Sequence, residues 1–219
     1  MEKVAGALTA TRHQKRSVIF SDKNSSETAY ILLSGVARIT CVNRKGRRTV
    51  ALMLSPGLIP AFPTDMTGIT YNFRCEAVTS CEVGTIELNR FMKIGLGIGS
   101  AAFQLMAASF LGGWDRVHLH CANLMGCTLK ERLALILLDL TQNFGVRDHD
   151  GGVILNVPVR HGDLAELIGV SRPRVTEHLR EFTQKQLISR ENQHFVVNDK
   201  GLRDFLMETR REGLHGERP

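Results

Sequence analysis

The chain has 219 residues, enough for one large domain or two small ones, and its 43% hydrophobic content allows packed cores. Five cysteines without a Cys-x-x-Cys pair argue against a disulfide framework and an ordinary zinc site, and the N-terminus lacks the apolar core of a signal peptide. We therefore expect a protein of the reducing cytoplasm. The net charge of +6 permits a polyanionic partner, but its excess lies in residues 1–127, where 14 Lys and Arg accompany 8 Asp and Glu.

Residues 18–88 alternate short apolar runs with turn residues, a pattern typical of a β-sandwich or barrel. The runs lie at residues 18–20, 30–33, 36–39, 50–54 and 83–86. No histidine occurs between Val18 and Leu88. An enzyme of the cupin type, which needs a cluster of His and Glu metal ligands in such a domain, is therefore disfavoured.

The segment between Lys93 and Asp115 carries no charge and is long enough to span a bilayer. Its glycines and polar residues lower its hydrophobicity, so we expect a buried interface helix near residues 100–126 and no membrane span. An apolar seam along this helix predicts pairing with a second copy of the chain. The seam residues are Met106, Phe110, Trp114, Val117, Cys121 and Leu124.

Thr128 and Glu131 have the spacing of a capping box, which predicts a helix from this point to about Phe144. Residues 146–152 are predicted to form a polar loop, and residues 153–155 a short strand. We place a domain boundary near residue 127.

Residues 160–186 have the pattern of a helix-turn-helix. Gly169 suits the left-handed turn that ends a first helix, Ser171 is predicted to cap a second, and Pro173 fits its first turn. Apolar residues recur at helical spacing in the second helix, at Val175, Leu179 and Phe182. A hairpin of residues 187–197 follows as a wing.

The outward side of the second helix is polar and basic at its start, as in helices that enter the major groove of DNA. An ordinary pair of packed helices with a solvated charged face is the alternative. The cap, the glycine turn and the wing together favour DNA binding. The predicted DNA-binding residues are Arg160, His161, Ser171, Arg172, Arg174, Thr176, Glu177 and Arg180.

The chain resembles the cyclic-AMP receptor protein and fumarate–nitrate reduction regulator (Crp/Fnr) family. The winged-helix half matches in Asp163-Leu164-Ala165, Gly169-Val170-Ser171-Arg172 and Leu187-Ile188-Ser189, and residues 30–39 and 54–57 are similar to strands of the family's β-roll. The resemblance implies an α+β fold with three parts. These are a β-roll sensor domain (a cyclic-nucleotide-binding-like jelly roll) over residues 1–98, a dimerisation helix and hinge over 99–127, and a winged helix-turn-helix domain over 128–219. It also implies a non-enzymatic homodimer that binds palindromic double-stranded DNA and contacts RNA polymerase.

The family's cyclic-nucleotide-binding residues are not matched. After Gly57, residues 58–63 replace the Gly-Glu pair; residues 70–73 stand where the phosphate arginine falls, and Arg74 is out of register. A buried phosphate would lack charged donors, so we expect no control by cyclic AMP. A pocket here would involve Phe62, Tyr71, Phe73, Arg74 and His118.

The family's other sensors leave one alternative open. The clustered N-terminal cysteines of iron–sulfur members are missing, and Phe62 and Pro63 stand where the haem ligands of the carbon-monoxide sensor fall. We therefore expect no cofactor and no metal. A cluster of His118, His120 and Cys121 keeps a haem- or redox-sensing regulator of the same fold as the alternative.

Overall fold

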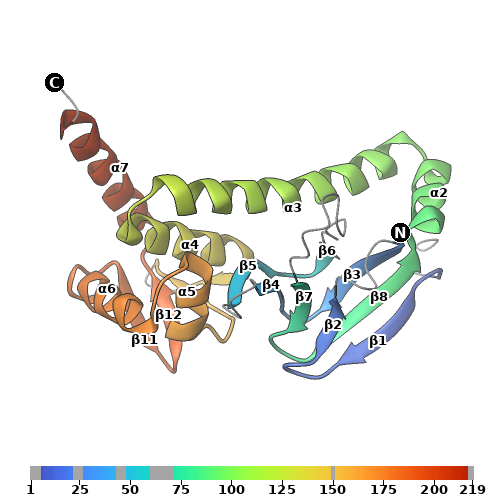
Figure 1. Cartoon of the computed structure of the whole chain (residues 1–219), viewed down its shortest axis with the longest axis horizontal. Helices are drawn as coiled ribbons and strands as arrows, with labels where there is room; N and C mark the ends of the chain where they lie inside the picture. Colours follow the sequence, from blue (N-terminus) through green and yellow to red (C-terminus); the bar gives the residue numbers. More distant parts are fainter. Residues whose placement is uncertain (1–5, 22–26, 43–47, 60–71, 149–150, 217–219) are drawn as a thin grey trace. The chain divides into compact units, whose positions relative to one another are not determined.

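The computed structural model describes residues 6–21, 27–42, 48–59, 72–148 and 151–216. By their contacts they form two compact units, Met1–Cys121 and Ala122–Pro219. The first unit is built from strands followed by a long helix, and the second combines helices with a small sheet (Figure 1). In the parts of the chain that are described, no helix has the length and apolar character needed to cross a bilayer.

The described strands of the first unit form two antiparallel four-stranded sheets, in the orders β1-β8-β3-β6 and β2-β7-β4-β5. Their bounds are β1 Thr9–His13, β2 Val18–Ser21, β3 Thr28–Ser34, β4 Ala37–Val42, β5 Arg48–Leu54, β6 Gly57–Ile59, β7 Asn72–Ala77 and β8 Cys81–Glu87. Each of the five predicted apolar runs overlaps a strand, and the expected β-roll is confirmed.

The core of this β-roll lies between the two sheets. Leu32 and Val83 from one sheet pack in the same buried cluster as Ile39 and Cys75 from the other. Alternation along each strand produces this arrangement, because every second side chain faces the opposite sheet. Gly35, at φ +89°, makes the turn between β3 and β4; a Cβ there would lie 2.2 Å from the carbonyl oxygen of Ser80.

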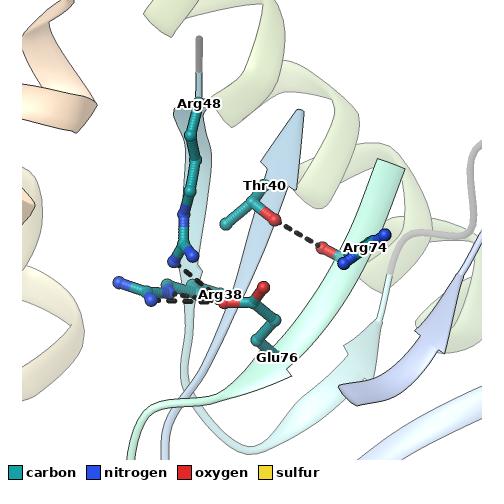
Figure 2. Close-up of polar contacts among 5 residues, drawn as sticks. All are labelled: Arg38, Thr40, Arg48, Arg74 and Glu76. Carbon is teal, nitrogen blue, oxygen red and sulfur yellow. Dashed lines mark hydrogen bonds and ion pairs between the residues drawn. The ribbon is translucent and has the colours of Figure 1, made fainter. Parts of the chain in front are cut away.

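The outer face of the second sheet carries a compact group of charges (Figure 2). Arg38 and Glu76 are partners across β4 and β7, with 3.2 Å between Nη2 and Oε2. Arg48 Nη2 lies 2.9 Å from the same oxygen. Arg74, one pleat further along β7, is exposed, and its carbonyl accepts a hydrogen bond from Thr40 Oγ1. Because Cys75 and Ala77 face the core, their polar neighbours on β7 face outward.

Two helices follow the β-roll. The helix α2, Leu88–Ile98, was not expected from the sequence; α3, Ser100–Gly126, agrees with the helix predicted near residues 100–126. Gly99, at φ +118°, separates them. In α3, Val117 packs against the β-roll core and Arg116 donates a hydrogen bond to the carbonyl of Met53.

The second unit begins with α4, Leu129–Phe144, and its predicted capping box is confirmed. The predicted polar loop at residues 146–152 is partly wrong, because Gly145–Arg147 form strand β9 beside β10, Val153–Leu155. All three residues of β9 are exposed, so no apolar alternation marks the strand in the sequence.

The remaining elements are α5 His161–Ile168, α6 Arg172–Gln184, β11 Ile188–Glu191, β12 His194–Val197 and α7 Asp199–Gly216. The strands form one sheet in the order β11-β12-β10-β9. The core of the second unit is built mainly by α4, α5 and α6. The largest fully buried side chains there are Leu133, Leu137, Leu140, Leu155, Leu164, Ile168, Phe182 and Leu202.

Candidate nucleic-acid interface

The turn between α5 and α6 has the geometry that the sequence predicted. Gly169 ends α5 at φ +73° and its N–H donates to the carbonyl of Ala165. Ser171 occupies the N-cap position of α6 in an extended conformation, and Pro173 lies in the first turn. The predicted cap by the Ser171 hydroxyl is absent. A cap hydroxyl accepts from the second or third amide of a helix, and Pro173 removes the second. The exposed Ser171 side chain is left on the surface.

The helix α6 is anchored by one apolar side. Val175, Leu179 and Phe182 are at most 4% exposed, as their spacing predicted. Phe182 also meets the ring of Phe205 on α7 edge-on, with 5.4 Å between centroids. Replacing a buried Phe by Ala typically lowers the free energy of unfolding by about 3–5 kcal/mol. Packing of this strength holds the inner side of α6 against the core, so the opposite side faces outward.

The opposite side of α6 is open to solvent. Arg172, Arg174, Glu177 and Arg180 are exposed, and Thr176 is half-buried. All of these except Arg174 line one open groove, together with Pro173. Guanidinium and carboxylate groups on a protruding helix have the donors and acceptors that base edges and phosphates require.

His161 connects α5 to α6 at this surface. Its Nδ1 lies 2.9 Å from Thr176 Oγ1, and that hydroxyl donates to the carbonyl of Arg172 at 3.0 Å. Burial, reinforced by the positive charges of Arg190 and Arg172, lowers the pKa of His161 below its usual 6.5. At the start of α5, the carboxylate of Asp163 accepts a bond from the N–H of Arg160, whose side chain is exposed.

The wing is a two-strand hairpin formed by β11 and β12. Its turn contains Asn192 and Gln193 at φ +45° and +73°, the two successive left-handed residues of a type I′ turn. Arg190 pairs with Phe195 across the hairpin, and its guanidinium carbon lies 4.3 Å from the centroid of that ring. Arg190 was not among the residues predicted to bind DNA. The hairpin register, which sets Arg190 opposite an aromatic residue, is the signal that could have shown it.

Glu181 holds the inner side of α6 to α4. Lys130 Nζ lies 2.8 Å from its Oε1, and Lys185 Nζ lies 3.5 Å from the same atom. The hydrogen bond from Lys130 lowers the pKa of Glu181 below its usual 4.5, and contributions from His178 and Lys185 act in the same direction. A carboxyl whose pKa is lowered by folding stabilises the fold only while it is ionised.

Glu181→Gln is expected to lower the free energy of unfolding by about 0.5–1 kcal/mol at neutral pH, because the partly exposed ion pair is lost. The stabilisation is complete above pH 4.5 and disappears as the pH falls through the lowered folded-state pKa. Denaturant titrations at neutral and acidic pH measure this difference, with Glu208→Gln on the exposed side of α7 as control. A difference that persists unchanged in acid would contradict the assignment.

The residues predicted for an effector pocket and for a haem or redox site are only partly described. Phe62 and Tyr71 lie outside the described residues; Phe73 packs against the β-roll core, and Arg74 is exposed. On α3, His118 is exposed whereas His120 is buried. Among the described residues, no three His, Cys, Asp or Glu side chains are grouped as metal ligands.

The predicted dimer seam is only partly described. The side chains of Met106, Phe110 and Trp114 are not among those described. Val117 packs on the β-roll of its own chain, Cys121 is exposed and Leu124 is half-buried.

Two family models match the chain: a cyclic nucleotide-binding domain over residues 10–95 and a Crp-like helix-turn-helix domain over residues 131–205. The nitrogen fixation regulation protein FixK of Azorhizobium caulinodans is 28% identical over 85% of this chain and 73% of its own length. The cAMP-activated global transcriptional regulator CRP of Escherichia coli O157:H7 is 20% identical over 85% and 88%.

Solved structures show the same fold. FixK2 from Bradyrhizobium japonicum superposes with a TM-score of 0.73 at 19% identity, over 90% of this chain and 96% of its own. A CooA mutant from Carboxydothermus hydrogenoformans gives a TM-score of 0.75 at 19% identity, over 93% and 90%.

Proposed function

The chain belongs to the Crp/Fnr family of DNA-binding transcription regulators, and from this premise we propose that it binds a palindromic operator as a homodimer, with one α6 in each half-site. The observation that carries this proposal is the geometry of α6. Val175, Leu179 and Phe182 fix its inner side, while an arginine-rich outer side stands open beside the wing. We assign the chain to the cytoplasm, with RNA polymerase as a further partner and no resident cofactor.

Each exposed residue of this surface has a proposed contact. Arg172, at the start of α6, binds guanine O6 and N7 in the major groove, and Glu177 accepts from cytosine N4. Arg174 and Arg180 bind phosphates on either side. Ser171, whose hydroxyl does not cap the helix, and Arg160 at the start of α5 contribute further phosphate contacts.

The dimer interface that we propose is the exposed side of α3. Positions spaced alternately by four and three residues, the spacing of a coiled-coil seam, are all exposed. They are Gln104, Ala108, Leu111, Asp115, His118, Ala122 and Met125. A second copy of this helix has the same spacing and would cover Leu111 and Met125, which are 59% and 82% exposed.

This seam differs from the one expected from the sequence. Val117 packs against the β-roll of its own chain, so we do not place this position in the interface with a second copy. We keep the three-part division expected from the sequence as part of this proposal, with residues 99–127 connecting a β-roll sensor domain to the DNA-binding domain along the chain.

Cyclic AMP is expected neither to bind nor to increase operator affinity. Of the arginines on the second sheet, Arg38 and Arg48 pair with Glu76 on its outer face, and Arg74 is exposed. A cyclic phosphate in the β-roll needs charged donors directed inward, which these three do not supply. Calorimetric titration with cyclic AMP and cyclic GMP, paired with gel shifts on the operator, measures both effects. Saturable micromolar binding together with a tenfold gain in operator affinity would contradict the prediction.

Genome-wide footprinting of the bound protein tests the proposed function as a whole. We expect protection of discrete inverted repeats near promoters. Occupancy spread evenly along the chromosome would refute sequence-specific regulation.

A further inference from the structure

His161 lies where three elements of the second unit meet. It starts α5, bonds to Thr176 on α6 and faces Phe195 on β12, with ring centroids 6.2 Å apart and planes at 26°. On the wing, Arg190 lies against the same phenylalanine. One imidazole therefore links the recognition helix to the ring that holds the wing arginine.

The hydrogen bonds assign the imidazole tautomer. The hydroxyl of Thr176 has a single proton, and that proton is donated to the carbonyl of Arg172. Thr176 Oγ1 is therefore the acceptor in the bond to His161, and Nδ1 carries the hydrogen. In the neutral ring Nε2 then has the lone pair.

We propose that His161 is a positioning residue that locks the wing against the recognition helix, so that Arg190 and Arg172 bind the same DNA duplex at a fixed spacing. This inference rests on the proposed function. Thr176 is half-buried, and Phe195 is 3% exposed, so both partners are held by their surroundings. Arg190 lies on an exposed strand, and its guanidinium is held over the ring of Phe195.

The charges around His161 make its protonation, and with it the affinity for DNA, depend on pH. Burial lowers the pKa of His161, and the positive charges of Arg190 on β11 and Arg172 on α6 lower it further. Asp163 on its own helix is bonded to the N–H of Arg160, and His194 on β12 lies 2.9 Å through Nδ1 from the carbonyl of Leu155. DNA phosphates neutralise the two guanidinium groups, so the pKa of His161 rises on binding and a proton is taken up. The pKa thus moves back toward 6.5, and operator affinity rises as the pH falls below about 6.5, by up to about tenfold for each pKa unit gained.

The central test is a double-mutant cycle on the mapped operator with full-length protein. His161→Ala is expected to weaken binding about fivefold, the loss typical of one hydrogen bond. Arg190→Ala should weaken it in the wild type but much less in the His161→Ala background, because the lock that positions Arg190 is already broken. His161→Asn, which retains a donor near Nδ1, should restore most of the affinity while abolishing the extra affinity at low pH.

Thr176 provides a matched pair of variants. Thr176→Val removes the acceptor and should resemble His161→Ala. Thr183→Val, on the same helix, removes a hydroxyl that also donates to the carbonyl four residues earlier but has no contact with His161. It should leave affinity unchanged.

A readout without DNA separates this inference from the proposed function. Imidazole ¹⁵N shifts of the free protein should show the Nδ1–H tautomer at His161. Three results would overturn the inference while the wild type still binds its operator. They are additive effects of His161→Ala and Arg190→Ala on affinity, a pH profile of affinity that His161→Asn leaves unchanged, and a hydrogen on Nε2 instead of Nδ1 in the free protein. Failure of the wild type to select any operator would instead refute the proposed function.

Discussion

Arg172→Ala is expected to weaken binding to the mapped operator by about 1–3 kcal/mol per half-site, roughly 5- to 150-fold, and to relax base preference at one position of that half-site. The side chain is exposed at the first turn of α6, on the groove shared with Thr176, Glu177 and Arg180. A bidentate bond to guanine depends on both donors of one guanidinium, so truncation removes affinity and preference together. Titrations of the operator and of its single-base variants measure both.

Arg174→Ala is the matched variant, two residues along the same helix. As a phosphate ligand it should weaken all sequences alike and reduce the salt dependence by about one counterion. Arg203→Ala, exposed on α7, serves as a control. Unchanged affinity in both Arg172→Ala and Arg174→Ala would refute the assignment of α6 as the recognition helix.

Ala122→Glu is expected to dissociate the dimer. The substitution adds a second pair of facing carboxylates to a proposed seam that already contains Asp115, near the C-terminal end of the helix, and like charges at facing positions repel. Loss of the second half-site should reduce operator affinity by about 10²–10⁴-fold, because the two recognition helices no longer bind as one unit. Sedimentation at micromolar concentration should give a mass near 24.3 kDa for the variant and near twice that value for the wild type.

Cys121→Glu, at the neighbouring position, distinguishes the two possible seams. Cys121 belongs to the seam expected from the sequence, whereas in the seam proposed from the structure it lies beside the contact and faces solvent. The variant should remain dimeric. If Cys121→Glu dissociates the dimer and Ala122→Glu leaves it intact, the interface is instead the seam expected from the sequence.

The DNA-binding half was predictable because its signals are local. Gly169 is left-handed, Pro173 lies in a first helical turn, and Val175, Leu179 and Phe182 repeat at helical spacing before a hairpin. Each of these constraints acts within a few residues, so the sequence pattern and the structure agree. The bond between His161 and Thr176 and the ring contact with Phe195 join residues 15 and 34 positions apart, which no local pattern reports.

The β-roll and α3 were predicted less completely for two reasons. Strand β1 exposes four of its five residues and β6 has only three, so neither shows the apolar alternation that marks a half-buried strand. In α3, apolar residues occur on more than one side and no charge interrupts residues 94–114. Periodicity alone therefore could not tell which side of α3 contacts the β-roll; in the structure Val117 packs against the β-roll core.

The central claim, that this winged helix reads a symmetric DNA sequence, is tested most directly by selecting bound duplexes from a random pool with the purified full-length protein. The account predicts an enriched inverted repeat with half-site centres about one helical turn apart, ~10–10.5 bp, in which one guanine per half-site becomes unselected when Arg172→Ala replaces the wild type. Enrichment of no motif, or of a motif without two-fold symmetry, would contradict it.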